Sequence, residues 1–221
     1  DETKNYFEYK NQDFPVNNIS SVTNGNTKYY VWDYKTIDQK GNQIDCSSFL
    51  EYQKPATSGI QKIDLIVVDC HGTIFSDDQC PTSDSVYTSR NGGTFGSNIT
   101  STKNILVIAP DYIGYGTSRA IDHPYMVADL NARTIIDAIL SAIKHSSDFG
   151  FTLNNGCQTI LCGYSQGGQT SLATLRAIQN KIPSELASLI NIKKCYCGAG
   201  PHDLEATMNI CCMPLMPKKG N

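Results

Sequence analysis

The 221-residue sequence lacks several features that mark whole classes of protein. It contains no apolar run approaching the roughly 20 residues that a membrane-spanning helix needs. It also has no excess of basic residues, since 18 Lys and Arg stand against 21 Asp and Glu and give a net charge of −3. The sequence therefore predicts no integral membrane segment. It also predicts no nucleic-acid partner, because nucleic-acid binders usually carry a basic surface.

Cysteine is plentiful, with nine residues, but it lacks the spacing of a metal site. No C-x-x-C occurs, and Cys195-x-Cys197 followed by Cys211-Cys212 does not match a zinc motif. The sequence therefore predicts no metal. Four cysteines lie in apolar, strand-like runs, where we expect small buried hydrophobes rather than disulfide partners: Cys70, Cys162, Cys195 and Cys197.

A complete dinucleotide fingerprint is missing as well. Gly114 and Gly116 form a G-x-G, but the later glycine and a downstream acidic residue at a second strand end are absent. No organic cofactor is therefore expected. We interpret the segment 109–118 as a structured loop near the functional site, with Tyr112 as a candidate for lining its pocket.

Short continuous apolar runs, typical of strands covered on both faces, recur along the chain. We expect four such strands, at 64–70, 104–109, 158–162 and 192–197. Apolar residues recur at helical spacing over 125–144, over 166–181 and, in a short segment, over 184–190. Strands that alternate with helices form a parallel sheet with right-handed crossovers, so this part of the chain predicts an α/β fold.

The chain divides into three parts. Residues 1–26 are polar and aperiodic, and we expect them to form an N-terminal arm. Residues 27–207 form the core, which begins with an antiparallel hairpin because the strand-forming runs 28–36 and 43–53 flank a turn sequence. Residues 208–221 are interpreted as a tail or as the start of a missing cap or C-terminal segment.

The strongest functional signal is Gly163-Tyr-Ser165-Gln-Gly167, which has the form G-x-S-x-G. It lies between a predicted buried strand and a predicted helix, the context in which such a serine projects its hydroxyl from a sharp bend. Ser165 is therefore the candidate nucleophile. The backbone N–H of Gln166 is a candidate oxyanion donor, because the helix N-terminus places partial positive charge there. The alternative interpretation of this motif is a glycine-rich turn that starts a helix and has no catalytic role.

A second signal, Cys70-His71-Gly72-Thr73, directly follows the first apolar strand. The loop after this strand donates the other oxyanion N–H in proteins with such a nucleophile turn. Thr73 is our candidate for that donor, with Ile74 next. His71 is interpreted as a structural residue of the loop, because the catalytic histidine comes last in chain order in this kind of fold.

Together these motifs resemble the α/β-hydrolase superfamily and, more narrowly, the group of secretory lipases and related bacterial serine esterases. The resemblance covers about residues 64–207 and rests on five motifs: His71-Gly72-Thr73, Pro110-Asp111-Tyr112-x-Gly114-x-Gly116-x-Ser118, His123-Pro124-Tyr125, Gly163-Tyr-Ser165-Gln-Gly167-Gly168 and Gly200-Pro201-x-Asp203-Leu204. It implies a mostly parallel sheet flanked by helices. It also implies hydrolysis of small-molecule or lipid esters through an acyl-enzyme on Ser165. A secreted or periplasmic location is favoured by the resemblance alone; the residues leave it unknown.

The acid and the base of a catalytic triad are not found in the sequence. They should follow Ser165 in the order acid, then histidine, but too little chain remains for two further strand–helix units of about 30 residues each. The one later histidine, His202, adjoins Asp203, and neighbouring residues cannot easily serve as base and orienting acid. The resemblance places this pair at a structural corner. We therefore expect the C-terminal strands, the acid and the histidine to lie beyond Asn221, on a segment absent from this chain.

Two other functions fit the same motifs. A serine peptidase of the same fold would share the turn at Ser165. A non-catalytic, hydrolase-like binding domain would keep the fold and truly lack the acid and the base. Reaction with a fluorophosphonate separates the last case, because only a serine activated by a base is a strong nucleophile.

Overall fold

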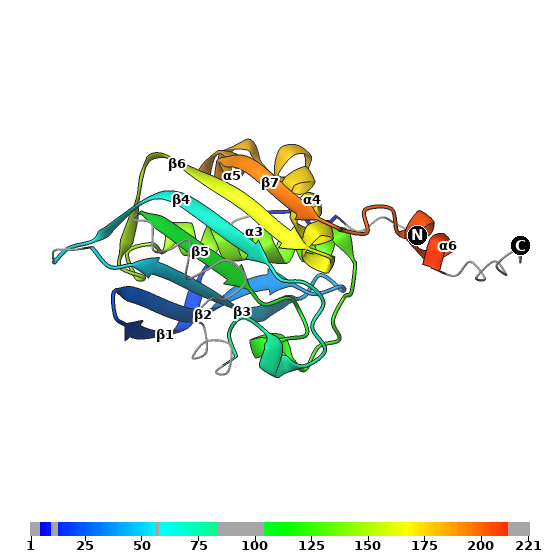
Figure 1. Ribbon diagram of the computed structural model, residues 1–221, viewed down its shortest axis with the longest axis horizontal. Coiled ribbons are helices and arrows are strands. Elements are labelled where there is room, and N and C mark those ends of the chain that lie inside the picture. Colours follow the sequence, from blue (N-terminus) through cyan, green and yellow to red (C-terminus); the bar gives the residue numbers. More distant parts are fainter. Residues whose placement is uncertain (1–4, 10–12, 56–57, 84–103, 212–221) are drawn as a thin grey trace, which may run out of the picture.

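The computed structural model describes residues 5–9, 13–55, 58–83 and 104–211. Its centre is a seven-stranded sheet in the order β1-β2-β3-β5-β4-β6-β7 (Figure 1). The strands are β1 (Val16–Asn24), β2 (Thr27–Ile37), β3 (Gln43–Gln53), β4 (Gln61–Cys70), β5 (Ile105–Pro110), β6 (Phe151–Tyr164) and β7 (Ile192–Gly198). The pairs β1–β2, β2–β3 and β3–β5 are antiparallel. The pairs β5–β4, β4–β6 and β6–β7 are parallel. This arrangement confirms the predicted α/β-hydrolase type of sheet and its N-terminal antiparallel hairpin.

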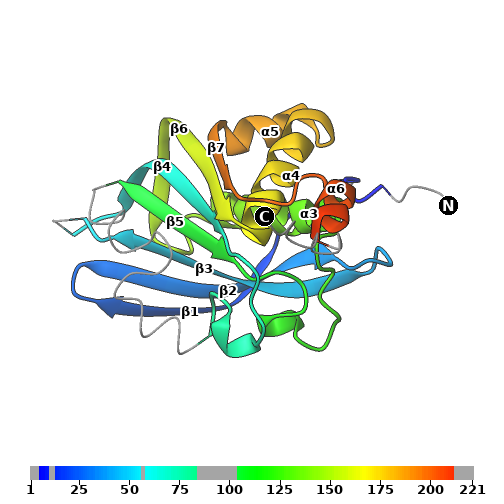
Figure 2. The same ribbon diagram turned by 45° about the vertical axis from the view of Figure 1, so that its right-hand side comes forward.

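The helices that contact the sheet in the described part of the chain lie together on one side of it (Figures 1 and 2). The α-helices are α3 (Ala128–Lys144), α4 (Gln166–Asn180), α5 (Ser184–Ile190) and α6 (Leu204–Cys211), and the 3-10 turns are η1 (Asp77–Gln79) and η2 (Gly116–Ser118). Figure 1 shows α6 apart from the sheet, beyond the end of β7. None of the described helices is long and apolar enough to cross a bilayer.

The middle strands are buried on both faces, which explains their continuous apolar runs. On β4, Ile66 and Val68 belong to the main core, which they share with residues of α3 and α4. Val67 points to the opposite face, where it packs with Val107 of β5 in a second, smaller cluster. Because successive residues of a strand alternate between the faces, a strand covered on both sides needs apolar residues at every position.

The segment that the sequence assigned to an irregular arm contains a strand. β1 pairs with β2 through a two-residue turn in which Gly25 takes a φ of +56°. Eight of its nine residues are exposed, so the strand carries no hydrophobic pattern and is formed by backbone hydrogen bonds at the sheet edge. Residues 5–9 also pack on the core, since Phe7 is buried and the Arg133 guanidinium donates to Tyr6 O at 2.5 Å.

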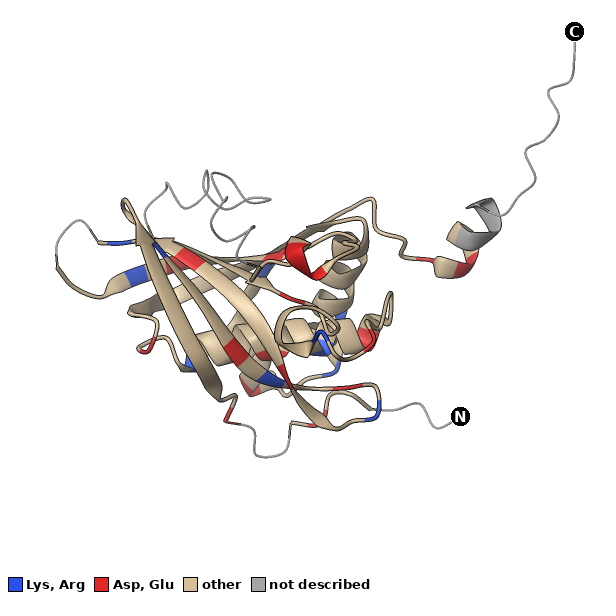
Figure 3. Cartoon of the chain, turned by 90° about the horizontal axis from the view of Figure 1, so that it is seen from below, with Lys and Arg blue, Asp and Glu red and all other residues tan. Residues whose placement is uncertain are grey.

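The prediction that four cysteines of the apolar runs are buried is confirmed for two of them. Cys70 and Cys162 are buried, as predicted, but Cys195 and Cys197 are only half-buried because β7 is the last strand of the described sheet. The seven cysteines whose side chains the structure describes, Cys46, Cys70, Cys80, Cys157, Cys162, Cys195 and Cys197, are all free thiols. Acidic and basic residues are interspersed over the elements seen in Figure 3.

Candidate active site

Ser165 sits at a sharp bend between the end of β6 and the start of α4. Its backbone has φ +57° and ψ −122°, a conformation that residues other than glycine rarely adopt. Two backbone hydrogen bonds hold the bend: Ser165 N–H donates to Gly198 O at 2.9 Å, and Gln169 N–H donates to Ser165 O at 3.1 Å. The strand–turn–helix context that the sequence predicted is therefore present, and Ser165 itself is half-buried.

The glycines that follow Ser165 allow α4 to approach the strands without an intervening side chain. A Cβ on Gly167 would lie 1.9 Å from Cys70 O, at the end of β4. A Cβ on Gly168 would lie 2.6 Å from Gly198 O, at the end of β7. Both distances are far below contact, so these two positions require glycine for close approach of one backbone to another.

The two segments expected to supply oxyanion donors lie against each other. Gln166 is the first residue of α4, so its backbone N–H belongs to the helical turn that has no partner within the helix. The loop after β4 reaches the same bend, because a Cβ on Gly72 would lie 3.3 Å from Tyr164 O. Next along that loop, the Thr73 hydroxyl is 3.1 Å from the Tyr125 hydroxyl.

His71 is engaged within its own loop, which supports the structural role predicted for it. Its ring stacks on Tyr112 with centroids 3.9 Å apart, and its Nδ1 lies 2.7 Å from Gly72 O. Tyr112 does not line a pocket, contrary to the expectation from the sequence. It is fully buried, it donates its hydroxyl to His71 O at 2.8 Å, and burial raises the pKa of its phenol well above the usual value.

His123 was noted in the sequence only as part of a motif, yet it contacts the residue after Ser165. Its Nε2 is 2.8 Å from the side-chain Nε2 of Gln166, and its Nδ1 is 2.7 Å from Ile113 O. Burial lowers the pKa of His123, which favours the neutral ring. The His-Pro-Tyr motif was the signal in the sequence, but only the fold shows which residue the imidazole reaches.

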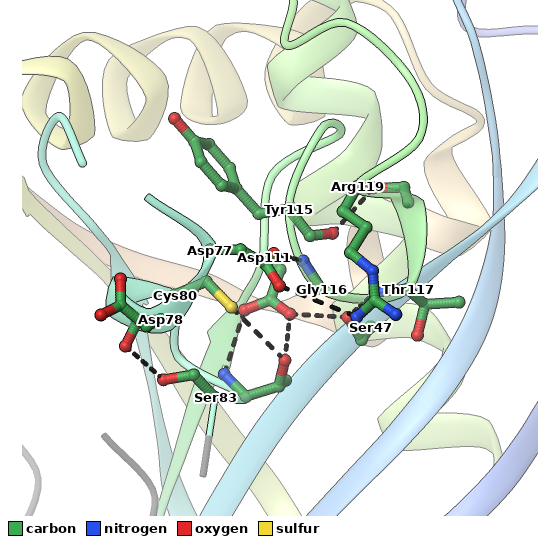
Figure 4. A network of polar contacts seen from close by, with 12 residues as sticks. Ser47, Asp77, Asp78, Cys80, Ser83, Asp111, Tyr115, Gly116, Thr117 and Arg119 are labelled. Atoms are coloured by element: carbon green, nitrogen blue, oxygen red, sulfur yellow. Dashed lines mark hydrogen bonds and ion pairs between the residues drawn. The ribbon is translucent and has the colours of Figure 1, made fainter. Parts of the chain in front are cut away.

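A second residue that the sequence analysis left without a role is Asp111, at the end of β5 (Figure 4). Its carboxylate is fully buried and accepts hydrogen bonds from Ser47 Oγ at 2.6 Å and from the N–H of Thr82 at 3.1 Å, with the Thr82 hydroxyl as a further donor. Ser47 Oγ in turn accepts from Thr117 N–H at 2.9 Å. Asp111 thus ties together β3, the loop after β5 and the loop around η1. Burial raises its pKa to about 6.

The His202–Asp203 pair lies between β7 and α6, directly before the first residue of the helix. Asp203 Oδ1 accepts the N–H of Ala206 at 2.8 Å, so the carboxylate caps the start of α6. His202 is exposed. No histidine of the described ranges hydrogen-bonds to the Ser165 hydroxyl. In the same ranges no group of three His, Cys, Asp or Glu residues is placed to hold a metal ion.

Ser165 does not line either of two cavities that lie among the described residues. One, of about 730 Å³, lies at the opposite end of the sheet and includes Lys28, Lys54 and Lys62 in its lining. The other, of about 630 Å³, lies between β7 and helices α4 and α5.

Solved structures similar to this chain include an esterase and a lipase. Neither a family model nor a curated protein matches the sequence. The rice cell wall degrading esterase LipA from Xanthomonas oryzae is 24% identical with a TM-score of 0.69, and the match covers 82% of this chain and 44% of that one. Candida antarctica lipase A is 14% identical with a TM-score of 0.57, covering 88% and 44%. The chain thus spans less than half the length of these proteins, and the likeness shows the fold.

Proposed function

We propose that this protein is a serine hydrolase that cleaves carboxylic esters of small molecules or lipids through an acyl-enzyme on Ser165. One observation carries the proposal: Ser165 holds a backbone conformation that costs energy, at the junction of a parallel strand and a helix. Such strain in a non-glycine residue is typical of a functional site. The esterase and lipase with the same fold support ester cleavage as the reaction.

The proposed reaction has two steps. Ser165 Oγ attacks the ester carbonyl carbon while a base takes its proton; the tetrahedral intermediate then collapses, and the alcohol leaves with that proton. Water, activated by the same base, next attacks the acyl-enzyme and releases the acid. The backbone N–H groups of Gln166 and Thr73 are proposed to hold the oxyanion in both steps. Loss of one such donor costs about 3 kcal/mol of transition-state stabilisation in other enzymes.

The base and its orienting acid are proposed to come from a C-terminal segment outside residues 1–221. Two observations support this: the Asp203 carboxylate is engaged as a helix cap, and the chain matches less than half of the Xanthomonas oryzae esterase and of the Candida antarctica lipase. We propose that such a segment adds a further strand beside β7. The end of that strand would lie close to Ser165, because β7 ends at Gly198, whose carbonyl accepts the Ser165 N–H.

The test uses the complete natural protein that contains this chain. A fluorophosphonate should label it at Ser165, Ser165→Ala should abolish the label, and Ser188→Ala, which changes an exposed serine of α5, should leave it intact. Turnover of para-nitrophenyl esters without cleavage of a peptide panel is expected. Cleavage of peptides alone would assign a peptidase instead, and an unlabelled protein would be a binding domain.

A further inference from the structure

We propose that His123 is a positioning residue, which fixes the side chain of Gln166 and, with three tyrosines of the same segment, sets the geometry of both oxyanion donors. The four aromatic residues Tyr112, Tyr115, His123 and Tyr125 are called the aromatic clamp below. This inference rests on the hydrolysis proposed above. It deepens that proposal by naming what holds the proposed donors in place.

One side of the aromatic clamp fixes the loop after β4. The Tyr112 hydroxyl donates to His71 O at 2.8 Å, and the Tyr115 hydroxyl donates to Ile74 O at 2.9 Å. The Tyr125 hydroxyl is 3.1 Å from Thr73 Oγ1. Three phenols therefore contact three residues of one short loop, on both sides of the Thr73 N–H.

On its other side, the aromatic clamp contacts Gln166 through His123. Ile113 O can only accept, so His123 Nδ1 carries the hydrogen in their 2.7 Å contact. In the neutral ring Nε2 must then be an acceptor, and it receives a hydrogen bond from the Gln166 side-chain amide at 2.8 Å. Because Gln166 is the residue directly after Ser165, this bond anchors the first residue of α4 from outside the helix.

The ring has little freedom to move. Tyr115 lies 5.0 Å from it between centroids and Tyr125 lies 5.9 Å away, edge to face. Tyr112 stacks on it at 6.0 Å, and on its backbone side a Cβ on Gly114 would lie 2.7 Å from His123 Cα. A side chain held by three rings and two hydrogen bonds can fix its partner within the narrow tolerance that catalysis needs.

The test compares four forms of the complete protein: the wild type, His123→Phe, Gln166→Ala and the double variant. His123→Phe keeps an aromatic ring and removes both nitrogens, whereas Gln166→Ala removes the side-chain amide and leaves the backbone N–H. For a para-nitrophenyl ester we expect each single variant to lower kcat by about 10- to 100-fold with KM within about twofold. The double variant should lose no more than the worse single variant.

Two outcomes would overturn the inference: a kcat unchanged in His123→Phe, or losses that multiply in the double variant. His145→Phe, at the half-buried residue that follows the end of α3, is the matched control and should keep full activity. Failure of this inference is distinguishable from failure of the proposed function, which is tested by fluorophosphonate labelling, by Ser165→Ala and by the ester and peptide panels.

A spectroscopic measurement tests the same hydrogen bond without a substitution at His123 or Gln166, so it does not depend on whether those variants fold. In the Ser165→Ala protein, ¹⁵N NMR of the imidazoles should show His123 near neutral pH with hydrogen on Nδ1 and an unprotonated Nε2. A hydrogen on Nε2 would contradict the bond from Gln166 and overturn the inference, whether or not the protein hydrolyses esters.

Discussion

Ser47 and Asp111 join the outer hairpin to the inner, parallel part of the sheet, with Ser47 Oγ donating to Asp111 Oδ2 at 2.6 Å inside the protein. The bond connects the antiparallel strand β3 to the residue that follows β5. It also places a carboxylate where no solvent reaches it, so burial raises the pKa of Asp111 from 3.8 to about 6.

This raised pKa gives stability a defined pH dependence. Between about pH 4 and pH 6 the folded protein holds a proton on Asp111 that the unfolded chain has released, so the Asp111 contribution makes the free energy of unfolding fall as pH rises. The contribution is fully lost above about pH 6. Urea midpoints measured from pH 4 to pH 7 should show a shallower fall for Asp111→Asn than for the wild type. An identical slope would show that Asp111 titrates normally.

Replacement of the strained serine should separate stability from activity. Ser165→Gly places a residue that accepts φ +57° at the bend and should raise the free energy of unfolding by about 1 kcal/mol while abolishing ester hydrolysis. Ser165→Ala should abolish hydrolysis without this gain. Urea denaturation of the two variants checks the difference, and equal stability would mean that the bend is unstrained.

Gly167→Ala tests the contact between α4 and β4. Its Cβ would lie 1.9 Å from Cys70 O, so the helix must shift, which we expect to cost about 1–3 kcal/mol and most of the activity. Gly156→Ala is the contrasting control, because Gly156 has a positive φ, +77°, which Gly167 does not have, and has open space around it. Thermal unfolding of both variants separates close approach from backbone strain. A Gly167→Ala protein as stable as the wild type would mean that the close approach to Cys70 O contributes nothing.

The buried ion pair between Arg133 and Asp137 supports the attachment of the N-terminal segment. Arg133 Nε donates to Asp137 Oδ2 at 2.7 Å, while Arg133 Nη1 donates to Tyr6 O at 2.5 Å. Arg133→Met leaves a buried carboxylate without its cation and should cost about 3–5 kcal/mol.

The double variant Arg133→Met, Asp137→Leu should recover most of that loss, because an apolar pair of similar volume needs no charge compensation. Thermal unfolding measures both variants. Limited proteolysis near residues 5–9 should become faster in each of them, since both lose the bond to Tyr6 O. A double variant as unstable as Arg133→Met would contradict the expectation.

The central strands and the helices were predictable because burial on both faces leaves a pattern in the sequence. Ile66, Val67 and Val68 are all apolar because the two faces of β4 are both covered. β1 was missed because an edge strand with exposed side chains needs no such pattern; the Gly25-Asn26 turn was its one signal. The first half of β6 was missed for the same reason, since Asn154 and Gly156 are polar or without a side chain.

Some residues of the candidate site could likewise be predicted from the sequence, and others could not. Ser165 could be found because its neighbours in sequence, the two glycines and the helix, create the bend that presents it. His123 and Asp111 could not be assigned roles, because their partners Gln166 and Ser47 are 43 and 64 residues away. Such contacts depend on how the loops cross the end of the sheet, and a single sequence does not encode that crossing in a local pattern.

The touching backbones of Gly167 and Cys70 make the width of the proposed oxyanion hole a fixed dimension of the scaffold. Exchanging one core side chain for another cannot widen or narrow this gap, since no side chain stands between the two segments. Attempts to retune the protein toward bulkier esters should therefore redesign the residues at the rim, and leave the hydrophobic interior as it is.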